Sequence, residues 1–311
     1  MDWTDRIGRR LKPRDLHVFL AVAESGSMAK AAEMLACSRP VVSKTVADLE
    51  ATLGVKLLDR TAQGVEPTRY GRALLSRSIA VFDELRKSVK EIEFLSDPGA
   101  GELRFGSLEP LMAGIASAAI ISMSKKFPRL SFRTELGNTD AQIQFLRTRK
   151  CEVTITRRLP GPGEADMQEE ELFHERLLIA VSLESPWARK RRLSIRDLAQ
   201  EQWILAPHEA EPGAPIFDGF QAAGLAMPPV NILSYSLSLR YSLLAGGPFI
   251  TAIPASAFLF GPMKNFLKVL PIELPAWRRP NIMMTLKDRS LSPPAEAFMD
   301  CVRHLCKPLR S

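Results

Sequence analysis

Small polar and cationic side chains are concentrated between residues 27 and 50, at spacings that suit contact with a nucleic acid. Base edges in the major groove offer hydrogen-bond acceptors and donors, and phosphates flank the groove, so hydroxyl, guanidinium and ammonium groups are complementary to them. We expect DNA contacts from Ser27, Ala29, Lys30, Ser38, Arg39, Pro40, Val41, Ser43, Lys44, Thr45 and Arg60. The predicted chemistry is therefore non-covalent recognition of double-stranded DNA.

Two short helices joined by a tight turn would position these side chains. Apolar or small residues recur at helical spacing over 28–35, and Ser27 precedes them as an N-cap. After a turn at 36–37, Ser38 caps a second helix, and Pro40 fits the first turn, where no intrahelical N–H is needed. The apolar stripe of the second helix consists of Val42, Val46 and Leu49. This layout is that of a helix-turn-helix.

The flanking segments decide between a DNA reader and a plain helical hairpin whose polar face meets only water. A preceding amphipathic helix ends at Ser25-Gly26 and supplies the third helix needed to bury the pair. Its apolar residues are Leu16, Phe19, Leu20 and Ala23. Residues 55–68 predict a short hairpin with Gly64 in its turn and Arg60 at its edge, where an arginine can meet phosphate. Together these segments favour a winged helix-turn-helix.

The stretch from Leu16 to Leu75 resembles, without gaps, the winged helix of LysR-type transcriptional regulators. The residues that carry the resemblance are Ala31, Ala32, Leu35, Ser38, Pro40, Ser43, Leu49, Glu50, Leu53, Gly54, Leu57, Arg60, Thr61, Thr68 and Gly71. Two positions depart from it: Met28 stands where that family usually has an aromatic or similarly bulky residue, and Arg39 stands where glutamine is common. Because arginine favours guanine or phosphate whereas glutamine favours adenine, the family's base preference does not carry over.

Residues 68–95 form the longest predicted helix, with an apolar repeat of seven residues. The expected dimerisation residues are Leu75, Phe82, Leu85, Val89 and Ile92. The alternative is a helix that packs only on its own domain. The resemblance implies dimerisation through this helix, because LysR-type regulators dimerise through a linker helix and commonly form tetramers. Residues 82–106 also resemble a subgroup that regulates uptake and catabolism of sugars and aromatic acids.

A break at 96–101, rich in Pro and Gly, marks a hinge between a DNA-binding domain (1–67) with its linker helix and a second domain, 102–311. Strands are predicted at 102–106, 130–136, 152–156, 176–182, 202–206, 230–234, 248–254 and 281–287. They alternate with helices at 110–125, 139–149 and, last, 293–305, which predicts βαβ units and a parallel sheet. The resemblance implies a two-lobed α/β fold of the periplasmic-binding-protein type 2, with lobe I at about 102–165 and 270–311 and lobe II at about 166–269.

Ligands of such α/β lobes bind at the carboxyl ends of strands, beside helix N-termini. The polar junctions at such ends predict a cleft for a small effector, an organic acid or a sugar derivative. The candidate effector-binding residues are Ser107, Leu108, Asn138, Thr139, Arg157, Pro207, His208 and Ser236. Ser107 and Thr139 are the first choices as hydrogen-bond donors. Considered singly, each junction also has a structural interpretation, in which its polar residues are ordinary helix caps or a solvated arginine and bind no ligand.

Composition agrees with a two-domain protein of 311 residues. The formal net charge is +7, yet residues 1–100 hold 16 Lys and Arg against 14 Asp and Glu, so DNA binding depends on individual cations. The four cysteines form no CxxC pair, and neither a disulfide, a metal site nor a cofactor is expected. No signal peptide begins the chain, and glycines and prolines interrupt the uncharged stretch 241–263, so we expect a cytoplasmic protein without membrane contact.

An enzyme, or a two-lobed solute-binding protein without a regulatory role, is the alternative function. The sequence contains no GxSxG, GxGxxG, P-loop or HExxH motif, and the four histidines are scattered at 17, 174, 208 and 304. We therefore predict a regulator that is not an enzyme. We expect effector binding to change the packing of the C-terminal domains, the spacing of the paired winged helices, the bend of the DNA and, in turn, contact with RNA polymerase.

Overall fold

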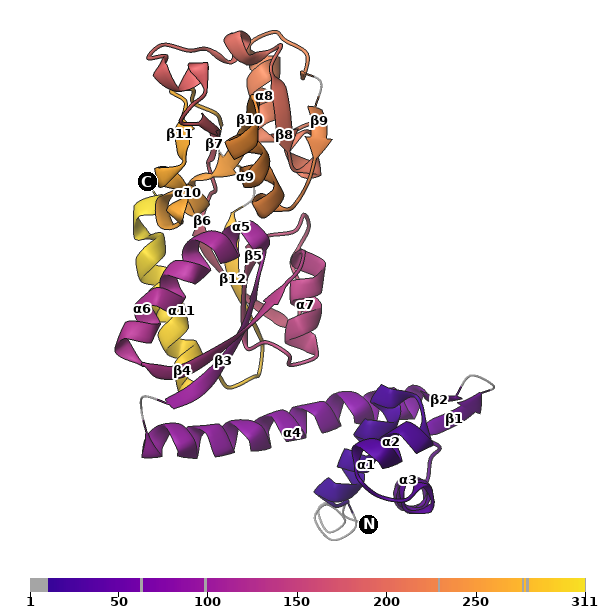
Figure 1. Ribbon diagram of the computed structural model, residues 1–311. Coiled ribbons are helices and arrows are strands. Elements are labelled where there is room, and N and C mark those ends of the chain that lie inside the picture. Colours follow the sequence, from indigo (N-terminus) through magenta and orange to yellow (C-terminus); the bar gives the residue numbers. More distant parts are fainter. Residues whose placement is uncertain are drawn as a thin grey trace. The chain divides into compact units, whose positions relative to one another are not determined.

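The computed structural model describes residues 11–61, 64–97, 100–228, 230–275, 277 and 280–310. They belong to two compact units, Met1–Val89 and Lys90–Ser311. Figure 1 shows a helical first unit in indigo and a second unit of two α/β lobes. No helix within the described ranges is both long and apolar enough to span a bilayer.

The first unit consists of three helices and a two-stranded hairpin. Its elements are α1 (Pro13–Ser25), α2 (Met28–Met34), α3 (Arg39–Leu53), β1 (Leu58–Thr61) and β2 (Gly64–Pro67). Apolar residues spaced three or four apart bring Phe19 and Val22 of α1, Ala31 of α2 and Val42 of α3 into one core, where each is fully buried. Burying a valine or phenylalanine side chain such as Phe19, Val22 or Val42 contributes about 1.5–3 kcal/mol. The predicted helix-turn-helix and wing are confirmed.

Backbone contacts fix the wing to the helices. Gly26, in the left-handed conformation at the end of α1, accepts a hydrogen bond from the N–H of Val65 at 2.9 Å. A Cβ on Gly64 would lie 2.5 Å from that same carbonyl oxygen, so the close approach requires glycine. At the other end of the hairpin, Oε1 of Glu50 accepts the N–H groups of Leu57 (2.8 Å) and Leu58 (3.2 Å).

The predicted long helix is α4 (Arg69–Ser96). It begins where the hydroxyl of Thr68 accepts the N–H of Gly71 at 3.0 Å. Gly71 lies so close to the preceding segment that a Cβ there would meet the carbonyl oxygen of Leu57 at 2.0 Å. Near its start, Leu74 and Leu75 pack against the core of the first unit.

Lobe I of the second unit has a five-stranded sheet covered on both faces (Figure 1). In the order β4-β3-β5-β12-β6, its strands are β3 (Ala100–Ser107), β4 (Arg129–Leu136), β5 (Val153–Arg157), β6 (Met167–Phe173) and β12 (Asn281–Leu286). Its helices are α5 (Glu109–Leu111), the π-helical segment η2 (Met112–Ala116), α6 (Ser117–Lys126), α7 (Thr139–Arg147) and α11 (Pro293–Cys306). Side chains alternate along β12: Met283 packs with α6 and α11, and Ile282 and Met284 pack with α7.

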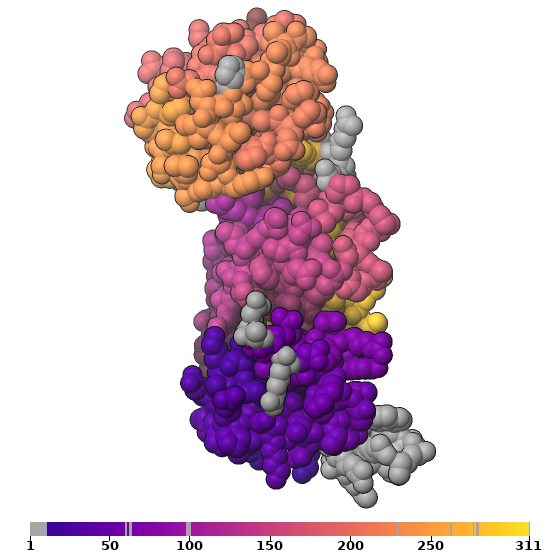
Figure 2. Space-filling view, turned by 90° about the vertical axis from the view of Figure 1, so that its right-hand side faces the viewer, coloured from indigo at the N-terminus to yellow at the C-terminus, as the bar shows by residue number. Residues whose placement is uncertain are grey.

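Lobe II has a second five-stranded sheet in the order β11-β7-β10-β8-β9. Its elements are β7 (Leu177–Ser182), β8 (Gln202–Leu205), β9 (Val230–Leu233), β10 (Phe249–Pro254), β11 (Leu267–Val269), α8 (Pro215–Ala222), α9 (Leu237–Gly246) and α10 (Ala255–Phe260). Short 3₁₀ turns occupy Pro186–Arg189, Ile195–Leu198, Pro207–Glu209 and Pro262–Asn265. In the space-filling view, lobe II in salmon and orange is set off from the magenta lobe I by a constriction (Figure 2). The two-lobed α/β architecture is therefore confirmed.

Two expectations for this unit need correction. The sheets are mixed, because β12 runs antiparallel to both β5 and β6, and β7 runs antiparallel to β10; only β3, β4 and β5, and β8, β9 and β10, form the predicted parallel sets. Lobe II also begins after β6 and not at about residue 166 as expected, because β6 pairs with β12 in the lobe I sheet. Residues 167–173 therefore belong to lobe I.

Candidate functional site

The second helix of the helix-turn-helix, α3, presents a polar face opposite its buried stripe. Val42, Val46 and Leu49 are buried in the core of the first unit, as their spacing predicts. The predicted DNA-contact residues of α3 and its N-cap are exposed or half-buried: Ser38, Arg39, Pro40, Val41, Ser43, Lys44 and Thr45. Ser38 holds the N-cap position, but its hydroxyl makes no capping hydrogen bond. The predicted cap bond is therefore absent at this helix.

The remaining DNA-contact candidates lie on α2 and on the wing. Ser27 caps α2 as predicted, because its hydroxyl accepts the N–H of Lys30 at 3.4 Å. Ala29 and Lys30 are exposed on the first turn of α2. Arg60 lies on β1, and its side chain is outside the described part of the structure. Ser27, Ala29 and Lys30 therefore lie together at the start of α2.

The residues predicted to dimerise divide into two groups along α4. Leu75 packs against the core of the first unit, and the ring of Phe82 lies 5.5 Å from that of His17, so these two make contacts within the chain. Leu85, Val89 and Ile92 are exposed, at 49%, 57% and 65%. Val81 and Leu95, which the sequence analysis did not select, are also exposed and extend the same face of the helix.

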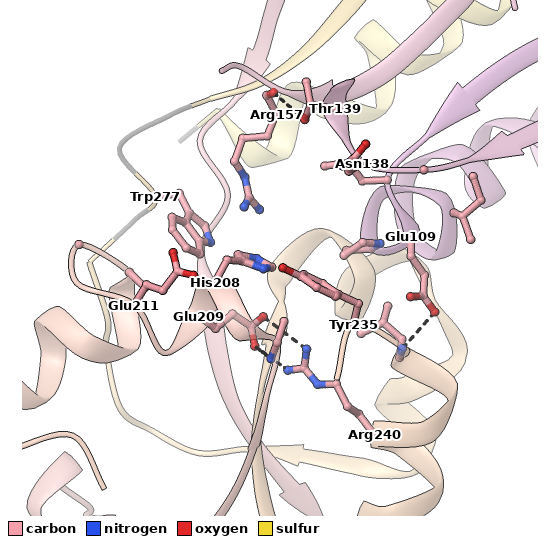
Figure 3. A pocket seen from close by; sticks show the side chains of 18 of the residues that line it. Glu109, Asn138, Thr139, Arg157, His208, Glu209, Glu211, Tyr235, Arg240 and Trp277 are labelled. Carbon is pink, nitrogen blue, oxygen red and sulfur yellow. Dashed lines mark hydrogen bonds and ion pairs between the residues drawn. The ribbon is translucent and has the colours of Figure 1, made fainter. Parts of the chain in front are cut away.

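A cavity of about 710 Å³ lies between the two lobes of the second unit. Five of the eight predicted effector residues line it: Leu108, Asn138, Thr139, Arg157 and His208. Arg157 extends from lobe I toward His208 and Tyr235 of lobe II (Figure 3). The lining residues that the sequence analysis missed include Glu109, Glu209, Glu211, Tyr235, Arg240 and Trp277.

Ser107, Pro207 and Ser236 do not line the cavity, and their predicted roles are corrected here. Ser107 is fully buried, and its hydroxyl donates to the carbonyl oxygen of Ile155 at 3.0 Å. Ser236 is the N-cap of α9, and its hydroxyl accepts the N–H of Leu239 at 3.2 Å. Pro207 begins a 3₁₀ turn, next to His208, which does line the cavity. The hydroxyls of Ser107 and Ser236 therefore bind backbone groups of the fold.

Thr139 and Asn138, at the start of α7, also have structural partners. The hydroxyl of Thr139 lies 2.8 Å from that of Thr156 and 3.2 Å from the carbonyl oxygen of Arg157. Oδ1 of Asn138 accepts the N–H of Ala141 at 2.9 Å, which leaves its amide nitrogen as the group able to donate to a ligand. This end of the cavity therefore carries hydrogen-bonding groups that the fold holds in place.

Aromatic rings form one wall of the cavity. The ring of His208 stacks on Tyr235 with centroids 5.6 Å apart and planes 10° apart, and it lies at the same distance from Trp277. The guanidinium carbon of Arg157 lies 4.5 Å from the centroid of the Trp277 ring. A planar cation over an indole face is a favourable cation–π geometry. Tyr235 and Trp277 were missed because neither belongs to a periodic pattern in the sequence.

His208 is neutral at neutral pH. Burial lowers the pKa of its imidazole from 6.5 to about 4, and the charges of Arg157 and Arg240 contribute to the same shift. A neutral imidazole has one donor and one acceptor nitrogen. His208 therefore offers the cavity a hydrogen-bonding ring without a positive charge.

An ion pair and an acidic side chain complete the lining. Arg240 and Glu209 are both buried, and Nη2 of the arginine lies 3.0 Å from Oε2 of the glutamate. Glu109, from lobe I, accepts the N–H of Leu237 of lobe II through Oε1 at 3.0 Å (Figure 3). The charge of Arg240 is therefore balanced by Glu209 within the protein. The carboxylate of Glu109 connects lobe I to lobe II. Among the described residues, no group of three His, Cys, Asp or Glu side chains is placed to hold a metal ion.

Two family models match the chain. The model "Bacterial regulatory helix-turn-helix protein, lysR family" matches residues 13–72, which contain α1 to β2. The model "LysR substrate binding domain" matches residues 96–307, which contain both α/β lobes and the cavity.

Curated relatives match along almost the whole chain. The HTH-type transcriptional regulator GbpR of Azospirillum brasilense is 27% identical over 297 residues, which cover 94% of this chain and 86% of that protein. The transcriptional dual regulator GltC of Bacillus subtilis is 25% identical over 289 residues, which cover 93% of this chain and 95% of that protein.

Solved structures share the fold. Full-length CbnR in complex with its target DNA superimposes with a TM-score of 0.62 at 22% identity, over 95% of this chain and 100% of that chain. A full-length OxyR variant from Pseudomonas aeruginosa gives a TM-score of 0.63 at 22% identity, over 96% and 99% of the two chains. Because these two family models match residues 13–72 and 96–307, the chain belongs to the LysR family of bacterial transcriptional regulators and is a regulator rather than an enzyme.

Proposed function

We propose that this LysR-type regulator senses a small anionic or sugar-derived effector in the cavity between its lobes and controls transcription of catabolic or transport genes. The observation that carries this proposal is the cavity of about 710 Å³, lined by two arginines, three glutamates, neutral hydrogen-bonding groups and an aromatic wall, in a chain that also contains a winged helix. Such a lining, mostly apolar with a few placed polar groups, is typical of small-molecule sites. We place this activity in the cytoplasm, where DNA and RNA polymerase are present.

DNA reading is assigned to α3. In the first turns of α3, Arg39 and Lys44 are exposed and Ser43 is half-buried, and a recognition helix contacts base edges with the residues near its N-terminus. Lys30 of α2 and Arg60 of the wing are assigned to the phosphate backbone, which supplies affinity but no sequence information.

Dimerisation is assigned to the exposed face of α4. Three of the five residues selected from the sequence, Leu85, Val89 and Ile92, expose large apolar side chains along one helix, and burial against a second copy would remove them from water. A pair of winged helices reads a pseudo-palindrome whose half-sites lie about 34 Å apart or a multiple of it. In this proposal residues 68–95 are the linker helix, residues 96–101 are the hinge, and tetramers form from such dimers.

The effector signal is assigned to movement between the lobes. A ligand that contacts Arg157 and Asn138 on lobe I and His208 on lobe II would favour one arrangement of the lobes over another, in proportion to its difference in affinity for the two. In the assembled oligomer this change would alter the spacing of the winged helices, the bend of the operator and contact with RNA polymerase.

Two experiments test the proposal on the full-length protein. Footprinting and fluorescence anisotropy should show a specific duplex bound with steep salt dependence, because phosphate contacts release counterions. Thermal-shift and calorimetric screens of organic acids and sugar acids should find a ligand whose binding is lost in Arg157→Ala and retained in Arg191→Ala, an exposed arginine outside the cavity. Salt-independent solute binding without DNA binding, or ligand binding unchanged by Arg157→Ala, would contradict it.

A further inference from the structure

The side-chain carboxylate of Glu109 binds the N-terminus of α9, where a ligand anion could otherwise bind. Its Oε1 accepts the N–H of Leu237, the first residue of α9, at 3.0 Å, and Ser236 accepts the N–H of Leu239 at 3.2 Å. A helix N-terminus ordinarily attracts the anionic group of a ligand through these N–H groups and the helix dipole. Here Glu109 and Ser236 of the protein itself accept these N–H groups, and the negative charge of Glu109 balances the positive end of the α9 dipole.

The charges around the cavity also disfavour a second anion. The lining contains two arginines, Arg157 and Arg240, and three glutamates, Glu109, Glu209 and Glu211. Arg240 is buried in its pair with Glu209, and the neutral imidazole of His208 adds no positive charge. The lining therefore carries a formal charge of −1, the difference between two arginines and three glutamates, even though it contains a guanidinium that suits a carboxylate.

The opposite end of the cavity suits a single carboxylate. Arg157 holds its guanidinium over the ring of Trp277, with 4.5 Å between the guanidinium carbon and the ring centroid. The indole N–H of Trp277 is buried and has no hydrogen-bond acceptor among the described residues. A buried donor in this state needs a partner, and a ligand oxygen beside Arg157 would supply one.

We propose that the effector is a monoacid that also carries an amine or hydroxyl group, and that Glu109 selects against a second carboxylate. This inference rests on the proposed function of the cavity. The acid group binds at Arg157 and the indole N–H of Trp277, and the donor group binds at the carboxylate of Glu109. A dicarboxylate of the same size would place its second charge against Glu109, and a juxtaposition of like charges lowers affinity.

The test uses pairs of compounds that differ only in one end group. Isothermal titration of the full-length protein compares gluconate with glucarate, 4-aminobenzoate with terephthalate, and 4-aminobutanoate with succinate. We expect at least one monoacid to bind, with its diacid partner at least about tenfold weaker. Glu109→Gln should reduce that ratio to within about threefold, because the amide keeps an oxygen for the N–H of Leu237 but removes the charge.

Glu184→Gln, at an exposed position outside the cavity lining, is the matched control and should leave the ratio unchanged. Equal affinities within the pairs, a diacid that binds when no monoacid does, or a ratio that Glu109→Gln does not alter would overturn the inference. The variant Arg157→Ala distinguishes a wrong role for Glu109 from a wrong assignment of the cavity as the effector site. If it abolishes binding but no pair shows discrimination, the cavity is the effector site and only the role of Glu109 is wrong.

Discussion

Nη2 of Arg240 lies 3.0 Å from Oε2 of Glu209 inside lobe II, where the two side chains are 2% and 4% exposed. Thr251 holds the same guanidinium, since its hydroxyl lies 3.2 Å from Nε and 2.9 Å from Nη2. Glu209 in turn accepts the N–H of Ala206 at 2.8 Å. The pair therefore connects α9, β10 and the 3₁₀ turn that carries His208, and α9 and the turn both contribute residues to the cavity lining.

Arg240→Met should destabilise the second unit by about 3–5 kcal/mol, because it leaves the carboxylate of Glu209 buried without its partner. Chemical denaturation followed by circular dichroism measures the change in the free energy of unfolding. Arg191→Met, at an exposed site, is the control and should change it by less than about 0.5 kcal/mol. A loss below about 1 kcal/mol for Arg240→Met would show that the pair is not the support inferred here.

Arg39→Ala and Ser43→Ala should relax base preference and leave dimerisation intact. Removal of a base contact costs about 1–3 kcal/mol at the preferred base pair and little elsewhere. Fluorescence anisotropy on the duplex that the wild-type protein selects from a random library, and on single-base variants of it, measures this pattern. Asp48→Asn, exposed farther along α3, serves as the control. An equal loss at every sequence would reassign both residues to phosphate contacts.

Val89→Asp should convert the dimer into a monomer, because it places a charge in the exposed apolar face of α4 that we assign to the partner copy. Sedimentation velocity should show the dimer dissociation constant raised at least about 100-fold. Arg86→Asp introduces the same side chain about 120° away from this face, given 100° per residue. A dimer that survives Val89→Asp, or that both variants disrupt equally, would place the interface elsewhere.

Stability should fall between pH 6.5 and pH 4 on account of His208. Its folded pKa of about 4 lies below the ordinary value of 6.5, so the unfolded chain binds more protons in this window. The contribution of neutral His208 to the free energy of unfolding is complete above pH 6.5, decreases as the pH falls, and is lost by about pH 4. We expect a loss of roughly 1–2 kcal/mol between pH 7 and pH 5.

Denaturation of wild type and His208→Gln at the two pH values measures this effect, since the variant lacks the titrating imidazole. His304→Gln, at an exposed site, should retain the wild-type difference. If His208→Gln and wild type lose the same stability between pH 7 and pH 5, another group accounts for the pH dependence.

Hydrophobic periodicity predicted most of the fold, and the exceptions have a physical reason. The edge strand β6, Met167–Phe173, has three consecutive glutamates and no alternation of apolar and polar residues. All three form ion pairs: Glu169 with Arg158 at 3.0 Å, Glu171 with Arg158 at 3.2 Å and Glu170 with Arg303 at 2.8 Å. Because Arg158 and Arg303 lie outside the segment, no local pattern indicates that the segment is a strand.

The candidate cavity was predicted less completely than the fold. The rule that ligands bind at the carboxyl ends of strands located Leu108, Asn138, Thr139 and Arg157. The rule does not indicate which way a side chain faces, and Ser107 faces the neighbouring strand and donates to Ile155. Glu109 and Trp277 belong to the cavity only because the two lobes meet there, and no feature within either lobe's sequence carries that information.

One of the hydrogen bonds that hold the wing joins two backbone groups, Val65 N–H and Gly26 C=O, and no side chain takes part in it. Gly64, where a Cβ would meet that carbonyl, and the core residues Leu58 and Val65 fix the position of the strands. Substitutions at the exposed strand positions Asp59, Thr61 and Glu66 therefore change what the wing touches without changing where it lies. After a gene duplication, two copies of such a DNA-binding domain can diverge in operator preference through point mutations alone, and each copy keeps a folded and correctly oriented wing at every step.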